Sequence, residues 1–417
     1  MSQSVEFALR EVPQSQRRGL YSISLVLLSF TFFTGTMFAG GKLGLSFRFI
    51  DMLWIAFIGN ALLAIYAAVL AFISCRSGLN AVLLGRFCFG QVGSRLSDMI
   101  LGGAELGWYA WGTAALAISL CGLWGWPDWV KYLLMIGLGF GFCTTALMGV
   151  NGLNLLSFFS VPLMLVLLII SIVKATYHVG GWESLITIMP EHSMSWSTAI
   201  TVVFGSFASG ATQATNWTRL SRSGKAAVTS SFFSFFIGNG VMIIAGGWCA
   251  IVYQQTDIVT VMILQGLSFM AIVMLCINLW NVQGPTLYNV SAAACHLIRT
   301  DPRQATTLIC AAIGILLAVS GISDMLVPFL GLLGALIPPI GGVIMADFWF
   351  VHRGHYPPLD ETSLPNFNLR GVLAYVIGAL IACGSPWIAP VVGIIASAVA
   401  YIALECCRKS SWNGCRP

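Results

Sequence analysis

The stretch TFFTGTMFAGGKLG, residues 31–44, places four glycines and three threonines inside a long apolar segment. A second stretch of the same kind, FGSFASGATQATNW, occupies residues 204–217. Glycine weakens a helix by about 1 kcal/mol per residue relative to alanine, so both stretches predict helices that are interrupted near their middle. Tight packing of intact helices through small residues is the alternative explanation.

The composition around these stretches is that of a membrane protein. Of the 417 residues, 58% are hydrophobic and 8% are charged, whereas soluble domains carry about 25% charged residues. The net charge of +5 comes from basic residues scattered at the ends of apolar runs, so we expect no nucleic-acid partner. A spanning helix needs about 20 apolar residues. The sequence therefore predicts an all-α membrane protein with twelve transmembrane helices, at 22–45, 50–74, 95–123, 130–149, 152–173, 196–216, 227–253, 259–281, 305–321, 325–346, 370–386 and 389–405.

The two interrupted segments are the first and the sixth of these spans, and they cross the membrane in opposite directions. An odd spacing of five spans is what an inverted five-helix repeat requires. Interrupted helices at matching positions of two such halves indicate a transporter binding site near the midplane. Backbone groups freed by the interruption need polar partners, because lipid supplies none.

The basic residues predict the orientation. With the N-terminus inside, the external segments contain four of the 20 Lys and Arg: Lys42, Arg48, Lys131 and Lys174. Arg95 is left unassigned, and all the others fall in cytoplasmic segments, as the positive-inside rule requires. We therefore expect both termini in the cytoplasm.

Two further spans contain helix-disturbing residues. The eighth carries NLWNVQGPTLYN, residues 278–289, in which Gly284-Pro285 is expected to bend or end the helix. The tenth carries LIPPIGGVIMADFW, residues 336–349, in which Pro338-Pro339 suggests a hinge or gate. A kinked packing helix is an equally good interpretation of that second stretch.

One carboxylate lies well inside the predicted membrane region. Glu105 stands in LGGAELGWYAWG, residues 101–112, and a charge at the bilayer centre costs about 2.5–3.5 kcal/mol. Trp108 lies on the same helical face, three residues later. An indole and a carboxylate together can hold a flat heteroaromatic ring, with Phe207 covering its other face. Such an acid is a candidate functional group; a protonated structural glutamic acid is the alternative.

The other ionisable groups are expected to be peripheral. Asp98 is a candidate ion-pair partner of Arg95 at the start of the third span. The five histidines, His178, His192, His296, His352 and His355, fall in loops or at helix ends and are expected to be interfacial rather than part of a buried proton relay.

Two other functional classes find little support. An intramembrane enzyme is disfavoured because the chain has no HExxH and no GxxxxGK[ST] motif, and no buried His/Asp pair accompanies a serine. A channel needs a continuous polar lining, whereas one buried carboxylate and interrupted helices fit alternating access better.

Taken together, the motifs resemble the nucleobase:cation symporter (purine/cytosine permease) family, and within it the bacterial cytosine permeases. The resemblance spans nearly the whole chain. It is carried by PQSQRRG (13–19), SFTFFTGTMFAGG (29–41), GRFCFGQVGS (85–94), LGGAELGW (101–108), GSFASG (205–210), NLWNVQGPTLY (278–288) and PPIGGVIMADFW (338–349).

The resemblance implies a LeuT-like fold of inverted five-helix repeats plus two C-terminal helices, with helices one and six broken. The corresponding division is a cytoplasmic tail at 1–19, a first repeat at 20–190, a second repeat at 191–350, and helices 11–12 with a tail at 351–417. It also implies rocking of a bundle that contains spans one and six, with helices five and ten as gates.

The resemblance also implies the site. A flat nucleobase would stack between Trp108 and Phe207, with its edge bound by Glu105, Ser206, Ser209 and Gln283. A sodium site would use carbonyls near Phe33 and Thr36 with oxygens near Asn278, Asn281 and Val282.

Two departures from the family bear on this site. Glu105 replaces a glutamine, which favours an amino-bearing ring and makes Glu105 a candidate proton carrier as well. Asn281-Val282 replaces two threonines, and valine has no side-chain oxygen for a hard cation.

The sequence therefore predicts a secondary transporter that imports cytosine or a related aminopyrimidine or purine by symport with sodium or a proton. A carrier of the same fold for a thiamine-precursor pyrimidine, an amine or an amino acid is the alternative. We expect a multi-pass monomer in the bacterial inner membrane, in contact with lipid, without a cofactor and without enzymatic activity.

Overall fold

The computed structural model of the protein is helical throughout its described part. It describes residues 11–190, 193–298 and 303–413, and within these ranges the side chains of 148–160, 303, 323–324, 360 and 408–413 are not described. His192 and most of the predicted N-terminal tail thus lie outside the described residues. No strand occurs in the described ranges apart from one isolated bridge between Arg18 and Ser221.

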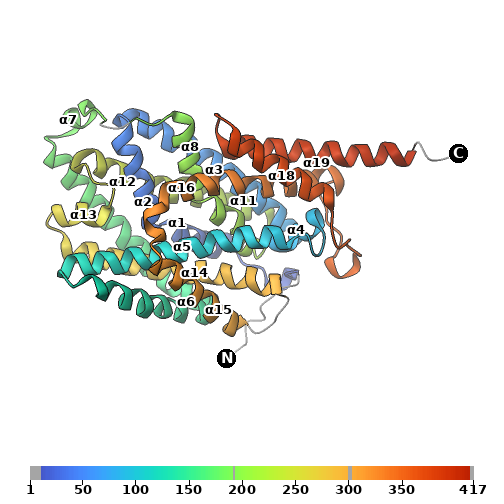
Figure 1. Ribbon diagram of the computed structural model, residues 1–417, viewed down its shortest axis with the longest axis horizontal. Helices are drawn as coiled ribbons and strands as arrows, with labels where there is room; N and C mark the ends of the chain where they lie inside the picture. Colours follow the sequence, from blue (N-terminus) through green and yellow to red (C-terminus); the bar gives the residue numbers. More distant parts are fainter. Residues whose placement is uncertain (1–10, 191–192, 299–302, 414–417) are drawn as a thin grey trace.

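The helices follow one another in a single bundle (Figure 1). They are α1 Leu20–Thr31, α2 Thr34–Ser46, α3 Phe49–Ser77, α4 Ala81–Phe89, α5 Arg95–Trp124, α6 Asp128–His178, α7 Trp182–Thr187, α8 Trp196–Gly205, α9 Ala208–Gln213, α10 Thr215–Thr218, α11 Gly224–Phe233, α12 Gly240–Tyr253, α13 Ile258–Leu264, α14 Ser268–Ile298, α15 Arg303–Val319, α16 Leu326–Leu336, α17 Pro338–Ala346, α18 Leu369–Gly384 and α19 Ala389–Asn413, with short 3-10 or π segments at Gln14–Gln16, Ser234–Asn239, Ile322–Met325, Asp347–Val351 and Leu359–Glu361.

Fewer than twelve helices of the described residues are long enough to count as membrane spans. Within the described residues, eight helical segments are long and apolar enough to cross a membrane, and the bent pair α1–α2 makes a ninth. The remaining three predicted spans correspond to shorter apolar helices at Trp196–Gly205, Gln304–Val319 and Leu369–Gly384. All twelve predicted segments are thus helical, but the count of twelve crossings is not confirmed.

The first span is broken where the sequence predicts it. α1 ends at Thr31, α2 begins at Thr34, and the two helices are bent by 53°. Small residues serve packing in the second half of the same span. A Cβ atom on Gly40 would lie 2.0 Å from the carbonyl oxygen of Ile243 in α12, and one on Gly44 would lie 2.3 Å from that of Gly247. Interruption of the helix therefore explains the first part of the stretch, and close packing through small residues explains the second part.

The sixth span is also interrupted, between α8 and α9. Ser206 ends α8, and Phe207 adopts φ −136°, ψ 19°, outside the helical range. Gly205 allows this segment to pass close to α16, because its Cβ would lie 2.3 Å from the carbonyl oxygen of Leu330.

The predicted end of the eighth span at Gly284-Pro285 is wrong, while a bend there, the other predicted outcome, stays a prediction. α14 continues through Gly284-Pro285 as one helix of 31 residues instead of ending there. Neighbouring helices in a bundle can satisfy the backbone that proline disturbs, and α5 and α6 pack against α14 here. The start of the span is also shifted, because Gly266, with φ +73°, separates α13 from α14.

In the tenth span α16 ends at Leu336 and α17 begins at Pro338, while the hinge or gate suggested for Pro338-Pro339 stays a prediction. The predicted fourth and fifth spans instead form one helical element, α6, in which two apolar windows, Asp128–Leu147 and Val161–His178, each meet the length of a span.

The N-terminal segment lies at one end of the bundle, and the predicted orientation in the membrane stays a prediction. The N-terminal segment contacts the end of α3 and the segment after α10, because Arg17 Nη1 donates to the Cys75 carbonyl and Arg18 N to that of Leu220. Figure 1 shows α7 and α13 at the opposite end from α4, and α18–α19 (red) on the side opposite α6 and α15. The division into repeats at 20–190 and 191–350 stays a prediction.

A buried charged cluster ties α4, α5 and α14 together. His296 Nδ1 lies 2.5 Å from Asp98 Oδ2, and Arg86 Nε donates to His296 Nε2 at 2.8 Å. The arginine contact requires an unprotonated Nε2, so the proton of a neutral imidazole lies on Nδ1, facing the carboxylate. His296 is 5% exposed and Asp98 1%.

This cluster corrects two predictions. His296 is buried and paired rather than interfacial, and Asp98 pairs with His296 rather than with Arg95, its neighbour in the same helix. The sequence places the two partners 198 residues apart, so only packing of α14 on α5 brings them together.

We expect Gly40→Ala to lower the thermal stability of the purified protein, because the added methyl group would collide with the Ile243 carbonyl and separate α2 from α12. Gly122→Ala is the control, since a Cβ there meets nothing within 4 Å. Detergent-solubilised protein followed by size exclusion after heating provides the measurement. Equal melting temperatures for the two variants would show that this close approach is not needed.

We expect Asp98→Ala to destabilise the fold more strongly. Removing the carboxylate leaves the buried Nδ1–H of His296 without its acceptor, which typically costs about 1–3 kcal/mol and more where a charged group is involved. Asp128→Ala removes a surface carboxylate whose side chain is 95% exposed and that lies 3.7 Å from Lys131, and such pairs contribute about 0–1 kcal/mol. The same heating assay should separate the two; a loss for Asp98→Ala no larger than for Asp128→Ala would contradict a stabilising role of the cluster.

Candidate functional site

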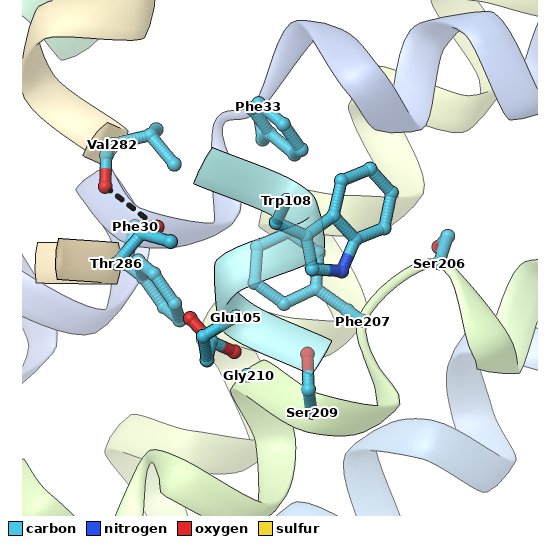
Figure 2. A pocket seen from close by; sticks show the side chains of 10 residues that line it. All are labelled: Phe30, Phe33, Glu105, Trp108, Ser206, Phe207, Ser209, Gly210, Val282 and Thr286. Atoms are coloured by element: carbon cyan, nitrogen blue, oxygen red, sulfur yellow. Dashed lines mark hydrogen bonds between the residues drawn. The ribbon is translucent and has the colours of Figure 1, made fainter. Parts of the chain in front are cut away.

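A small cavity lies where the two broken spans meet α5 and α14 (Figure 2). It is lined by Phe30, Phe33, Glu105, Trp108, Ser206, Phe207, Ser209, Gly210, Val282 and Thr286. Its volume is about 10 Å³, which is room for about one water molecule. The cavity is therefore closed and too small for a ring compound in this conformation.

Aromatic rings form most of the wall. Phe33 contacts Trp108 edge-on, with ring centroids 5.2 Å apart, and reaches Phe207 at 6.4 Å, again edge-on. Trp108 also packs against Phe329 at 5.5 Å, and Phe207 against Phe30 at 5.2 Å. The rings of Trp108 and Phe207 thus each pack against a further ring, while the ring of Phe33 contacts both.

Glycine fixes the position of the Phe207 ring. A Cβ on Gly210 would lie 2.5 Å from that ring and 2.9 Å from Phe30. Any larger residue at 210 would push one of the two rings into the cavity, so the glycine belongs to the shape of the site.

Two polar groups of the lining, Glu105 and Ser209, lie together at one end of the cavity. Figure 2 shows Glu105 and Ser209 on the side away from Phe33. Ser209 and Asn289 are the side chains that face the Glu105 carboxyl group, and Glu105 is 2% exposed. The cavity therefore has aromatic walls and one acidic, hydrogen-bonding end.

A chain of three asparagines leads to this polar end. Asn80 Nδ2 donates to Asn216 Oδ1 at 2.8 Å, and Asn216 Nδ2 donates to Asn289 Oδ1 at 2.9 Å. Asn289 Nδ2, the last donor of the chain, has no hydrogen-bond partner among the described residues. It thus remains available to an acceptor at the polar end, whether the Glu105 carboxylate or a bound molecule.

The structure brings together five of the six residues predicted to bind substrate, since Glu105, Trp108, Ser206, Phe207 and Ser209 all line the cavity. Gln283 does not line it. Its Nε2 donates to the Tyr109 carbonyl at 2.8 Å, and its side chain packs against Gly112.

Residues that were not predicted to bind substrate complete the site. Phe30, Gly210 and Thr286 line the cavity, and Asn289 faces Glu105. Asn289 is the last residue of the polar stretch 278–289. Its spacing of three from Thr286 places both on one face of α14, which is the signal that could have identified it.

The residues predicted for a cation site surround the break of the first span. Asn278 Oδ1 accepts a hydrogen bond from Thr34 N at 2.9 Å, and its Nδ2 donates to the Phe32 carbonyl. Asn281 Nδ2 donates to the Ser29 carbonyl at 3.2 Å, and Thr36 Oγ1 donates to the Phe33 carbonyl at 2.7 Å. Val282 is buried beside them and lines the cavity. The predicted residues are thus neighbours, and the two asparagines bond to backbone groups of the first span.

Comparisons with known proteins agree with this architecture. A nucleobase-cation-symport-1 family transporter, solved in a closed conformation with bromovinylhydantoin bound, superposes with a TM-score of 0.86 at 16% identity, covering 96% of this chain and 95% of that chain. A sodium-coupled sialic acid symporter in a substrate-bound outward-open state gives a TM-score of 0.69 at 13% identity, covering 96% and 92%. These likenesses confirm the predicted LeuT-like fold.

Other known proteins resemble the chain more closely in sequence than these two structures do. The cytosine permease of Escherichia coli (strain K12) is 33% identical over 406 residues, which is 97% of this chain and 95% of that protein. A family model described as permease for cytosine/purines, uracil, thiamine and allantoin matches residues 11–404. The chain is therefore a multi-pass membrane protein that belongs to this family of permeases.

Proposed function

We propose that the protein imports a nucleobase, with cytosine or a related aminopyrimidine or purine as the substrate, by cation symport and alternating access. The observation that carries the proposal is the cavity, where aromatic walls and a single acidic end lie between two broken helices. The similar permeases and the hydantoin-bound structure support it, because their ligands are flat, nitrogen-rich rings.

The bound ring would lie between Trp108 and Phe207. Offset or edge-on aromatic contacts contribute about 0.5–1.5 kcal/mol each beyond the area that they bury. The ring edge would meet Glu105, which accepts N–H groups, and the hydroxyl groups of Ser206 and Ser209. Asn289, whose Nδ2 has no partner among the described residues, would donate to a ring carbonyl or nitrogen. Gln283 would join the site only after its bond to Tyr109 breaks.

Binding also needs movement. A cavity of about 10 Å³ excludes a pyrimidine, and the Phe33 ring contacts both stacking residues. Phe33 lies at the break between α1 and α2, so a change in the 53° bend would carry its ring out of the site. Rocking of a bundle that contains spans one and six, within repeats at 20–190 and 191–350, would supply this change.

Of the two candidate coupling ions, a proton is the one for which the cavity contains a carrier, namely Glu105. We further propose a monomer in the bacterial inner membrane with both termini in the cytoplasm. The basic residues of the N-terminal segment, which lie beside the ends of α3 and α10, support that orientation. The protein would act as a carrier and not as an enzyme.

A second candidate substrate is the aminopyrimidine precursor of thiamine. The Glu105 carboxylate favours it, because an ionised carboxylate accepts hydrogen bonds and an amino group donates two. A thermal-shift screen of the purified protein against cytosine, uracil, purines and aminopyrimidines distinguishes the two. Stabilisation by none of these ring compounds, together with stabilisation by an amine or amino acid, would overturn the nucleobase proposal.

We expect Trp108→Ala to weaken cytosine binding by ten-fold or more, because it removes one stacking wall worth about 1.5–3 kcal/mol in buried surface and ring contact. Trp124→Ala is the matched control in the same helix, since Trp124 is 52% exposed and lies outside the cavity. Binding is measured with labelled cytosine on purified protein. The same affinity in both variants would remove Trp108 from the site.

We expect Glu105→Gln to abolish accumulation driven by a pH gradient while binding of cytosine changes by less than ten-fold, because glutamine keeps the shape and an acceptor oxygen but carries no proton. Uptake into proteoliposomes, with and without a pH gradient, is the measurement. Glu183→Gln, which changes an exposed acid in α7, serves as the control. An unchanged response to the gradient would rule out the proton role of Glu105.

A further inference from the structure

Hydrogen-bond donors of the protein itself satisfy carbonyl groups at the break of the first span. A broken helix exposes carbonyl groups at the C-terminal end of its first half, where the helix dipole is negative and where transporters of this kind hold a cation. Here Phe33 O accepts from Thr36 Oγ1 at 2.7 Å and from Thr36 N at 3.1 Å. Phe32 O accepts from Asn278 Nδ2, and Ser29 O from Asn281 Nδ2 at 3.2 Å.

The orientation of the Asn278 amide follows from its two partners. Thr34 N can only donate, so the oxygen of the amide must face it, at 2.9 Å. The NH₂ group then faces the Phe32 carbonyl, which can only accept. The oxygen that a cation would need is therefore already engaged, and the group turned toward the carbonyl is a donor.

Apart from Asn278, whose oxygen is engaged, the side-chain oxygens at the break are those of Asn281 and Thr34, fewer than a sodium ion takes. A hard cation takes several oxygen ligands, and Val282, 3% exposed beside the break, offers none from its side chain. Thr286 Oγ1 donates to the Val282 carbonyl at 2.9 Å. Thr34 Oγ1 is buried without a partner among the described residues, but one hydroxyl group does not make a coordination shell. The residues present do not fit a sodium ion.

We propose that the side-chain amides of Asn278 and Asn281 take the place of a sodium ion at the break of the first span, so that the span closes and the transporter works without sodium. The neutral N–H donors satisfy the Phe32 and Ser29 carbonyls, next to the positions near Phe33 and Thr36 where a cation would bind. The sodium-coupled symporter of the same fold shows that coupling to this ion occurs on this architecture. The statement about transport rests on the proposed function; the statement about sodium binding does not.

The first test measures sodium binding without any substrate. Purified full-length protein is heated in sodium chloride, potassium chloride or choline chloride at equal ionic strength, and its melting temperature is followed. We expect the same value in all three salts. A saturable stabilisation that sodium gives and the other two salts do not would overturn the proposal.

The second test introduces side-chain oxygens at positions 281 and 282, where the family has two threonines. The double variant Asn281→Thr/Val282→Thr places two hydroxyl groups at the break and removes one amide, whereas Asn281→Val has the same shape as threonine at 281 but no oxygen. We expect both to be less stable than the original protein in choline, and only the double variant to regain stability in sodium. Absence of a sodium response in a folded double variant, or an equal response in Asn281→Val, would contradict the assignment of these two positions.

Uptake measurements complete the test. Reconstituted protein should accumulate labelled cytosine equally well when external sodium is replaced by choline, and a strict sodium requirement would overturn the inference. If no nucleobase is taken up in either salt, the proposed function fails, while the melting experiments still decide whether sodium binds.

Discussion

The architecture depends on how a helix that is interrupted inside a membrane keeps its backbone hydrogen-bonded. Lipid offers no partners, and each unsatisfied group costs several kcal/mol. Asn278 meets this constraint with one side chain, whose amide bonds to the Phe32 carbonyl inside the break and to the first N–H of α2. The same contact fixes α14 to the broken span and thereby sets one wall of the cavity.

The cavity combines two kinds of groups that would each be costly alone. A buried carboxylate needs hydrogen bonds, and Ser209 and Asn289 surround Glu105 with groups that can give them. The apolar rings need contact surfaces, and Phe33 supplies an edge to both stacking residues while the site is closed. A ligand with a flat face and a polar edge can replace both sets of contacts at once, which is why such a compound suits the site.

The remaining buried charges near the site are neutralised in place. Asp98, His296 and Arg86 form a connected group with compensating charges at one end of α5. Glu105 lies seven residues further along the same helix, and within the described residues it makes no ion pair. The carboxylate in the cavity therefore differs from the structural one in having no permanent cation beside it, and this leaves it free to respond to a ligand or a proton.

Local sequence patterns were enough to predict the helices, the two broken spans and the membrane location, because each depends on apolar run length and on the positions of glycine and proline along the chain. The face shared by Glu105 and Trp108 follows from helical spacing in the same way. The effect of Gly284-Pro285 could not be predicted from sequence, since neighbouring helices decide whether a proline ends a helix. Nor could the pairing of Asp98 with His296, the joining of Asn80, Asn216 and Asn289, or the displacement of Gln283 from the cavity. These contacts link residues far apart in the chain, and only the packing of α14 against α5 and the broken spans determines which polar groups meet.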